Sequence, residues 1–240
     1  MKYGFICLLL LSFTFGSCHF FHGERIKGNG NIVTENRDVS TFKEIEVSSA
    51  IDVQLSPGES PSVKVEIDQN VQPYIEVYTK GSVLYIHQKN NTSLNTSKRV
   101  KVYVTAVALS RLEVSGACNL SVTDTIRSNG QLDISISGAS EAEMMIKAET
   151  LSLGMDGASK ANLEGNVKDM RVDANGSCDL KAFGLSADNV DVKLEGASSV
   201  QVYPTVKLLA DANGASKIYY KGNVTPAYTL NGASSISKVD

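Results

Sequence analysis

Apolar and polar residues alternate along most of the chain after residue 42. This two-residue period is typical of β-strands with one buried face, whereas an amphipathic helix places apolar residues at intervals of three and four. The apolar positions are rich in Val, Ile and Leu. The pattern therefore predicts an all-β fold. One long run of positions on the predicted inner face is Leu132, Ile134, Ile136, Gly138, Ser140, Ala142, Met144 and Ile146.

A short motif, with Gly at its second position and usually Ala and Ser after it, recurs seven times in the second half. Its glycines are 22, 19, 19, 20, 18 and 18 residues apart. A repeat of this length indicates a solenoid. Together with the strand period, it predicts a right-handed parallel β-helix with about 18–22 residues per Gly-Ala-Ser coil. The motifs are Ser115-Gly116-Ala117-Cys118, Ser137-Gly138-Ala139-Ser140, Asp156-Gly157-Ala158-Ser159, Asn175-Gly176-Ser177-Cys178, Glu195-Gly196-Ala197-Ser198, Asn213-Gly214-Ala215-Ser216 and Asn231-Gly232-Ala233-Ser234.

Stacked parallel coils place equivalent residues over one another, about 4.8 Å apart. If the strand period continues through the motif, Gly and the following Ser or Cys face inward and the intervening Ala faces outward. Cys118 and Cys178 then lie in one column three coils apart. That separation, about 14 Å, exceeds the reach of about 7 Å for a disulfide. We expect two free, buried thiols.

The position before each motif Gly forms a predicted column of polar side chains on the outside. Stacked polar side chains form hydrogen-bonded ladders, and such a stripe can also bind sugar hydroxyls. Tyrosines near the last coils are candidates for an interaction patch. The predicted interaction surface comprises Asp156, Asn175, Glu195, Asn213, Asn231, Tyr219 and Tyr220.

Residues 31–110 are expected to form less regular coils that cap the solenoid, continuous with the regular coils of residues 111–240. Aligning Glu46–Ala50 with Glu113–Ala117 indicates a degenerate first coil. The last coil has no capping element, so its edge is either blunted by Lys238 and Asp240 or pairs with another copy in a homo-oligomer. The other expected elements are strands at Ser62–Ile67, Ser82–Gln88 and Arg99–Thr105, a short helical turn within Asp68–Tyr78, and a loop at Lys89–Lys98.

The N-terminus has the features of a bacterial export signal. Lys2 precedes an apolar run, Phe5–Phe15, that is too short to span a membrane as a helix. Gly16-Ser17-Cys18 resembles a lipobox, although Phe15 stands where Leu is usual. We expect residues 1–17 to be the signal peptide, Cys18 to be lipidated, and residues 18–30 to be a tether. The membrane is then a partner through the lipid anchor, and the expected location is the outer membrane, on its cell-surface or periplasmic face.

The chain resembles a known family in residues 28–238. Phe42-Lys43-Glu44-Ile45-Glu46-Val47, Asp52-Val53-Gln54-Leu55 and the Gly-Ala-Ser coils are similar to the family called putative auto-transporter adhesin, head GIN domain. The resemblance implies an exported or surface protein of Bacteroidetes with a β-helical fold. It offers no catalytic residues to transfer to this chain.

The residue types that carry catalysis are scattered. The three histidines are His19 and His22 in the expected tether and His87 in an expected strand. We predict no catalytic residues, no metal site and no cofactor. The net charge is −3 and the chain has no cluster of basic residues, so we expect no nucleic acid as a partner. The acids on the expected outer face of the coils are Asp156, Asp173, Glu195 and Asp211.

Three hypotheses about function follow. The leading one is a non-enzymatic lipoprotein of the cell envelope that acts as a surface adhesin or interaction scaffold, with a glycan or a host or cell-surface protein as its partner. The second is a carbohydrate-active protein that binds or cleaves polysaccharide on the same scaffold. The third is a structural or envelope-stress protein that faces the periplasm.

Overall fold

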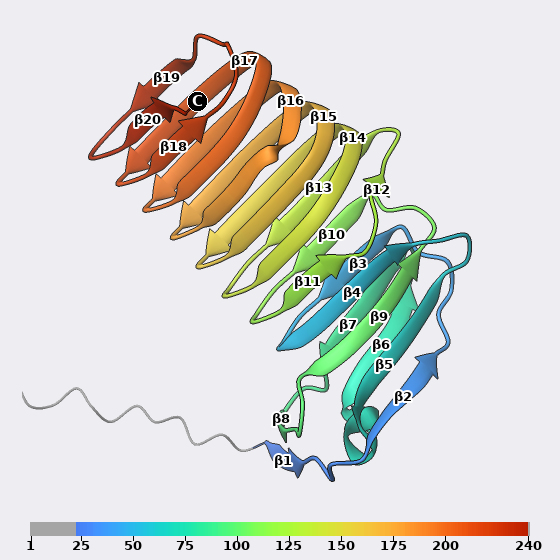
Figure 1. Cartoon of the computed structure of the whole chain (residues 1–240). Helices are drawn as coiled ribbons and strands as arrows, with labels where there is room; N and C mark the ends of the chain where they lie inside the picture. Colours follow the sequence, from blue (N-terminus) through green and yellow to red (C-terminus); the bar gives the residue numbers. More distant parts are fainter. Residues whose placement is uncertain (1–22, 240) are drawn as a thin grey trace, which may run out of the picture.

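A computed structural model describes residues 23–239 as a stack of parallel β-coils preceded by a smaller mixed sheet (Figure 1). This confirms the predicted parallel β-solenoid, which has about seven turns. The regular part comprises β10 (Arg111–Val114), β11 (Asn119–Val122), β12 (Ile126–Arg127), β13 (Gln131–Ile136), β14 (Glu141–Gly157), β15 (Lys160–Gly176), β16 (Asp179–Gly196), β17 (Ser199–Gly214), β18 (Lys217–Tyr220), β19 (Ala227–Leu230) and β20 (Ser235–Lys238).

Apolar side chains at alternate positions form continuous columns inside the stack. Leu151 of β14 pairs with Met170 of β15, which pairs with Val190 of β16 and then Leu208 of β17. All four are buried. Burial of such a side chain contributes roughly 1.5–3 kcal/mol, so the parallel register is favoured wherever these columns continue.

Each motif glycine forms a corner of its coil and is exposed, so the prediction that it faces inward was wrong. Gly157, Gly176 and Gly196 have positive φ angles of 77°, 104° and 99°. This left-handed conformation interrupts the strand alternation, because it turns the residues on both sides of the corner outward. The alanines after most of these glycines are exposed, as predicted, and the Ser or Cys that follows returns to the interior.

The Gly column is required by the close approach of successive coils. A Cβ atom added to Gly176 would lie 2.5 Å from the carbonyl oxygen of Gly157 in the coil before it. The same carbonyl accepts a hydrogen bond from the amide of Ser177 at 2.7 Å. Equivalent bonds join the corners throughout the stack, for example from Ala197 to Gly176 at 2.8 Å. A side chain at a corner position would therefore push successive corners apart and break the hydrogen bonds between them.

The inward Ser column hydrogen-bonds backbone groups next to the corner. The hydroxyl of Ser198 accepts from the amide of Cys178 at 3.2 Å and donates to the carbonyl of Gly176 at 3.3 Å. Ser216 repeats the pattern with the amide of Ser198 and the carbonyl of Gly196, both at 3.3 Å. These buried polar side chains therefore satisfy one another and the turn.

A degenerate coil lies directly beneath the first regular one, as predicted. Glu46 and Val47 of β3 (Glu44–Val47) pair with Glu113 and Val114 of β10. Ser49 occupies the corner with a φ of 90°. Its hydroxyl accepts a hydrogen bond from the amide of Gln88 at 3.3 Å.

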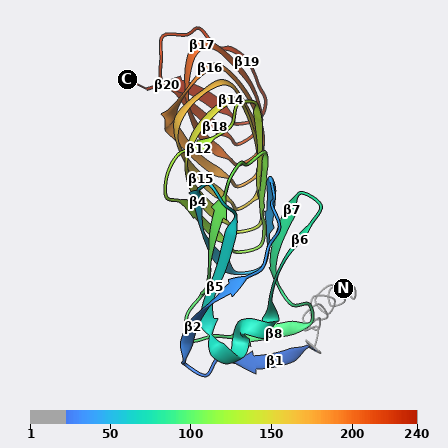
Figure 2. The same cartoon turned by 90° about the vertical axis from the view of Figure 1, so that its right-hand side faces the viewer.

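The N-terminal region is a mixed sheet that closes one end of the stack (Figure 2). β3 and β4 continue the parallel stacking onto β7 and β9, whereas β2–β5, β5–β9 and β6–β7 are antiparallel pairs. The expected helical turn is a 3₁₀ helix, η1. The elements are β1 (Glu24–Lys27), β2 (Ile32–Arg37), β4 (Ile51–Pro57), β5 (Ser62–Asp68), η1 (Gln69–Tyr74), β6 (Ile75–Lys80), β7 (Val83–Gln88), β8 (Thr92–Asn95) and β9 (Val100–Ala106).

Two segments are more ordered than the sequence pattern indicated. Part of the expected tether is β1, which pairs in parallel with β8 inside the expected loop. Ile26 and Leu94 are partners in this ribbon, and both pack against the main core. Strands this short are joined by backbone bonds and one apolar pair, so they carry little alternation in sequence.

Asp68 ties three segments of this region together. Its buried carboxylate accepts hydrogen bonds from the amide of Gly30 at 2.7 Å and from the amide and hydroxyl of Ser97 at 2.9 and 2.7 Å. Burial alone would raise the pKa of Asp68, but the hydrogen bonds from Ser97 and Gly30 outweigh it and hold the pKa below its usual value.

The opposite end of the solenoid has an open edge formed by β19 and β20. Lys238 stands over the buried Tyr220, at a position that continues an inward column. A charge at such a position disfavours pairing between edges. This geometry supports blunting of the edge by Lys238; the homo-oligomer stays a prediction, and Asp240 lies outside the described residues.

Replacing a corner glycine should destabilise the stack far more than replacing a strand glycine. We expect Gly176→Ala to lower the free energy of unfolding by at least about 2 kcal/mol, since it adds backbone strain to a clash with Gly157. The control is Gly154→Ala, because an added Cβ there meets nothing closer than 3.9 Å. Urea denaturation measures both, and equal midpoints for the two variants would contradict the corner argument.

Asp68 should make stability depend on acidity. Its folded pKa is lowered, so its contribution is present above the unfolded value of about 3.9 and is lost as pH falls through the folded value. We expect Asp68→Asn to cost about 2 kcal/mol at pH 7, with a weaker loss of stability between about pH 5 and pH 3 than in the parent protein. Thermal unfolding across this range is the measurement. The exposed Asp156→Asn serves as the control, and an unchanged acid profile in Asp68→Asn would refute the assignment.

Candidate functional site

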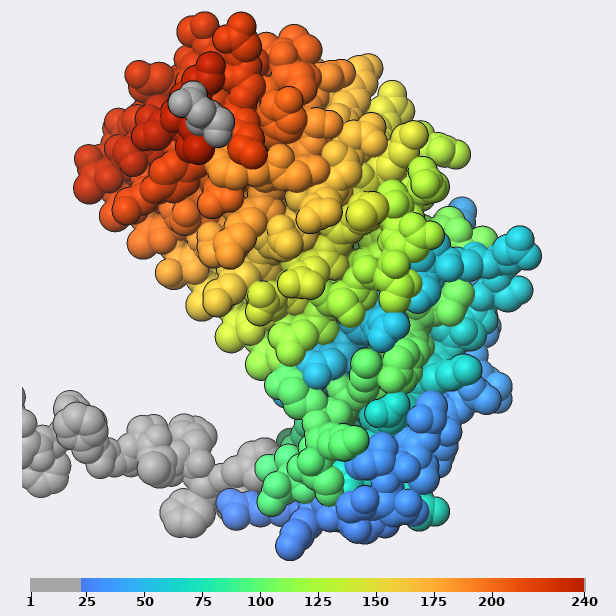
Figure 3. Space-filling model, viewed as in Figure 1, coloured from blue at the N-terminus to red at the C-terminus, as the bar shows by residue number. Residues whose placement is uncertain are grey.

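The predicted polar column exists and lies on the outside at the solenoid corner. Asp156, Asn175 and Glu195 are exposed, Asn213 is half-buried, and the four are paired in register from β14 to β17. The amide of Asn231 donates to the side-chain oxygen of Asn213 at 2.8 Å, which extends the ladder by one coil. Successive coils follow one another as bands of colour across the surface (Figure 3).

The two tyrosines of the predicted interaction surface face opposite sides. Tyr219 is half-buried and pairs with Gln201 and Ser237 on the outer face. Tyr220 is only 8% exposed and belongs to the core, so its assignment to the surface was wrong. The reason is the strand period: Ile218 faces inward, and the residue two positions later must do the same.

A groove of about 490 Å³ crosses the outer face of β13–β17. Two outward columns line it, and the strand backbone at Met170 and Val190, whose side chains are buried in the core, lies between them. The side-chain amide of Asn189 donates to Asp169 at 2.7 Å, and Arg171 lies 3.4 Å from Asp191. The groove was not predicted from the sequence. The signal that could have revealed it is that its polar residues occupy equivalent positions in successive coils. The other lining residues are Gln131, Thr150, Ser152, Lys207 and Leu209.

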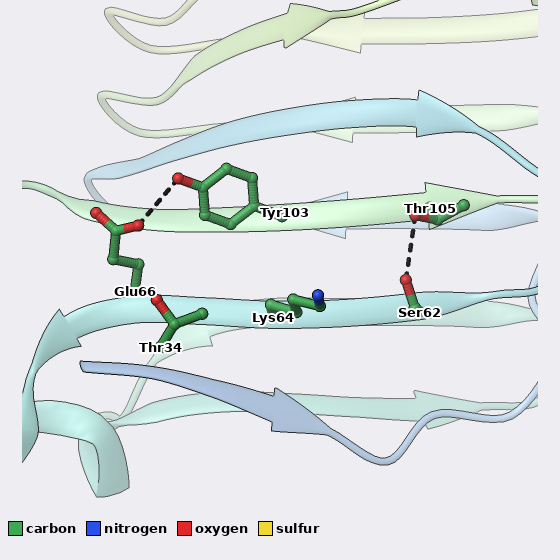
Figure 4. Close-up of a pocket in the computed structure, with 6 residues that line it drawn as sticks. All are labelled: Thr34, Ser62, Lys64, Glu66, Tyr103 and Thr105. Atoms are coloured by element: carbon green, nitrogen blue, oxygen red, sulfur yellow. Dashed lines mark hydrogen bonds between the residues drawn. The ribbon is translucent and has the colours of Figure 1, made fainter.

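A second hollow, of about 400 Å³, lies on the mixed sheet (Figure 4). The hydroxyl of Tyr103 donates to Glu66 at 3.0 Å, and that of Ser62 donates to Thr105 at 3.1 Å. Lys64 lies between these two pairs. All three strands that form the hollow, β2, β5 and β9, are antiparallel neighbours separated in sequence, and local patterns do not reveal such pairings.

The acids of the regular coils do not converge. Asp173 and Asp211 share a column, but Lys193 lies between them in the register. Asp156 and Glu195 are separated in the same way by Asn175. Among residues 23–239, no group of three or more His, Cys, Asp or Glu side chains is placed to hold a metal ion.

The one histidine in the described region lies beside aromatic and acidic neighbours. The His87 ring meets Tyr78 edge-on, with 5.7 Å between centroids, and lies 3.6 Å from Glu76. His19, His22 and the expected lipid site Cys18 lie outside the described residues. No helix between residues 23 and 239 is long and apolar enough to cross a membrane.

Cys118 and Cys178 are free and buried, as predicted. Each thiol lies in the inward Ser column and contacts a corner carbonyl oxygen: Cys118 Sγ is 3.2 Å from that of Ser115, and Cys178 Sγ is 3.4 Å from that of Asn175. Burial raises the pKa of the Cys118 thiol. The thiols therefore pack as small core residues rather than as a reactive pair.

Comparison with known proteins identifies similarities over nearly the whole chain. A family model described as putative auto-transporter adhesin, head GIN domain, matches residues 41–224. No curated protein matches the chain.

Several solved structures share the fold. A putative adhesin from Bacteroides fragilis NCTC 9343 has 18% identity and a TM-score of 0.81, covering 89% of this chain and 100% of that one. A putative adhesin from Parabacteroides merdae ATCC 43184 has 22% identity and a TM-score of 0.74, with 90% and 100% covered. A putative lipid binding protein from Parabacteroides distasonis ATCC 8503 has 23% identity and a TM-score of 0.73, again with 90% and 100% covered. At these identities the likeness concerns the fold alone.

The two core thiols should be unreactive in the native protein. In a chain that starts at Gly23, we expect neither Cys118 nor Cys178 to react with a water-soluble thiol reagent until the protein is unfolded, because both are buried. After denaturation without reductant, both thiols should react with the reagent. Fast reaction of the native protein, or thiols missing from the denatured one, would show that the columns are not as described.

Proposed function

The chain belongs to the putative auto-transporter adhesin, head GIN domain family, and we propose that it is a non-enzymatic lipoprotein of the outer membrane that presents a rigid β-solenoid at the cell surface for adhesion. Its partner in this proposal is a glycan or a protein of another surface. The lipid on Cys18 supplies the attachment to the membrane.

The placement of the two ends of the solenoid is the observation that carries this proposal. β1 and β8 lie at one end of the molecule and β19 and β20 at the other (Figure 1). Five residues lie between Cys18 and Glu24, so six residue-to-residue steps join them, and these reach at most about 21 Å when extended. A lipid on Cys18 would thus hold the β1 end near the membrane and leave the coils to project away from it.

The chemistry of the outer face supports binding rather than turnover. The acids of the coils stand in columns interrupted by Asn or Lys, and acid–base catalysis on a glycan needs two carboxyl groups facing one bond. Ladders of polar side chains and shallow polar hollows offer hydrogen bonds to hydroxyl and amide groups of a partner.

Loss of Cys18 should release the protein from the membrane. We expect Cys18→Ser to abolish metabolic labelling with a radioactive fatty acid and to move the protein out of the membrane fraction, since the lipid is the anchor. Cys118→Ser is the matched control and should remain membrane-bound and labelled. Labelling of Cys18→Ser equal to the parent would sink the proposal.

Surface exposure and adhesion need a separate measurement on intact cells. Added protease should remove the protein from the outside, and cells that display it should bind glycan or matrix above the background of deletion cells. Resistance to protease in intact cells would instead support a protein that faces the periplasm. Turnover of a uronic-acid polysaccharide that is lost in Asp173→Asn or Asp211→Asn would establish the enzyme hypothesis in its place.

A further inference from the structure

The groove on β13–β17 repeats the same arrangement once per coil. Its first column pairs Gln131, Thr150, Asp169, Asn189 and Lys207 in register from strand to strand. The second column continues from Ser152 through Arg171 and Asp191 to Leu209 in the same order. Each coil therefore adds one row of two outward side chains to the wall of the groove.

The spacing of these rows favours one kind of linear ligand. Parallel strands are about 4.8 Å apart, so the rows recur at that interval along the solenoid axis. An extended peptide rises about 3.3 Å per residue, so its successive residues do not stay aligned with rows at this spacing. One sugar unit of a β-linked, extended glycan has nearly the length of the interval between rows, so each unit can face an equivalent row.

The side chains suit hydroxyl groups, which both donate and accept hydrogen bonds. Asp169 and Asp191 supply acceptors, Arg171 and Lys207 supply donors, and Asn189 supplies both. Thr150 and Ser152 are small and leave room beside the larger Asp169 and Arg171 of the next coil. The Arg171–Asp191 contact is long at 3.4 Å and both side chains are partly exposed, so either can turn to a ligand at little cost.

One apolar side chain lines the groove: Leu209 on β17 is half-buried on the outer face. Met170 and Val190 lie between the two polar columns, but their side chains are buried in the core and offer a ligand almost no surface. The C–H face of a pyranose ring can pack against Leu209 while its hydroxyls reach the polar columns. The two acids Asp169 and Asp191 are balanced by Arg171 and Lys207, so the groove offers a charged ligand no net attraction and suits a neutral one.

From this arrangement we infer that the groove is a binding site for a neutral, linear, β-linked glycan, with one sugar unit per coil. The inference rests on the proposed adhesive function and names its ligand class. The glycan lies along the solenoid axis, and the number of coils in the groove limits the number of units bound.

Oligosaccharides of graded length test this directly. The probes are cello- and chito-oligosaccharides of two to eight units, titrated by calorimetry into the mature protein. We expect affinity to rise with each unit, by about fivefold when each adds one net hydrogen bond, and to level off near five units, the number of strands that line the groove. β-1,4-linked oligoglucuronates of the same lengths, which differ from the cello-oligosaccharides by a carboxylate on each unit, should bind no more tightly than the neutral probes.

Variants inside and outside the groove distinguish specific binding in the groove from non-specific binding to the protein surface. We expect Asn189→Ala and Arg171→Ala each to weaken binding of the longest probe by about fivefold or more. The controls Asn162→Ala and Lys181→Ala change exposed side chains on the other arm of neighbouring coils, away from the groove, and should bind as the parent. Unchanged thermal unfolding confirms that each variant is folded.

The inference fails if no neutral oligosaccharide binds the folded protein, if affinity does not depend on length, if the groove variants bind as well as the parent, or if an extended peptide library binds in place of the sugars. Its failure differs from that of the proposed function. Cells that still adhere through the anchored protein, with no oligosaccharide bound, would retain the adhesive function and lose only the groove as its site.

Discussion

The fold depends on how closely consecutive coils approach at the glycine corner. The carbonyl of each corner glycine accepts a hydrogen bond from the amide one residue past the next corner, at 2.7–2.8 Å for the pairs from Ala139 to Gly116 through Ala233 to Gly214. The same carbonyl occupies the space that a Cβ of the next corner would need. The corner hydrogen bond can form only where glycine leaves room for the carbonyl of the previous coil. The corner therefore sets the register for the whole coil. The apolar columns inside the stack then align without further specification.

A register fixed inside the stack also orders its outside. Each outward position of one coil stands beside its equivalent in the next, so a single choice of residue type becomes a column across the surface. The ladder that ends with Asn213 and Asn231 and the two walls of the groove are built in this way. Such a scaffold can vary its outer columns without disturbing the core, and this separation suits the proposed role of presenting a surface.

The sequence predicted what is periodic and missed what is not. The seven motifs determined the parallel stacking, the Cys118–Cys178 column and the alignment of Glu46 with Glu113. The inward direction of the glycines was wrong, because strand alternation was extended through a corner whose positive φ interrupts it. The mixed sheet was missed because antiparallel partners such as β2 and β5 lie some thirty residues apart and leave no local pattern. The polar ladder was predicted because it occupies a single column, the position before each motif glycine. The groove lies between two columns, and predicting it would have required knowing which two columns are neighbours on the outer face.

Trapping neighbouring coils with a new disulfide tests the stacking most directly. Ser159 Oγ lies 3.6 Å from Cys178 Sγ in the adjacent coil, and in-register neighbours about 4.8 Å apart lie within the usual Cα range for a disulfide. When Ser159→Cys is refolded from denaturant under mild oxidation, so that the oxidant reaches the thiols before they are buried, mass spectrometry should find residue 159 linked to Cys178 and Cys118 still free. A link between Cys118 and Cys178, or no link to residue 159 at all, would contradict the stacked register on which the account depends.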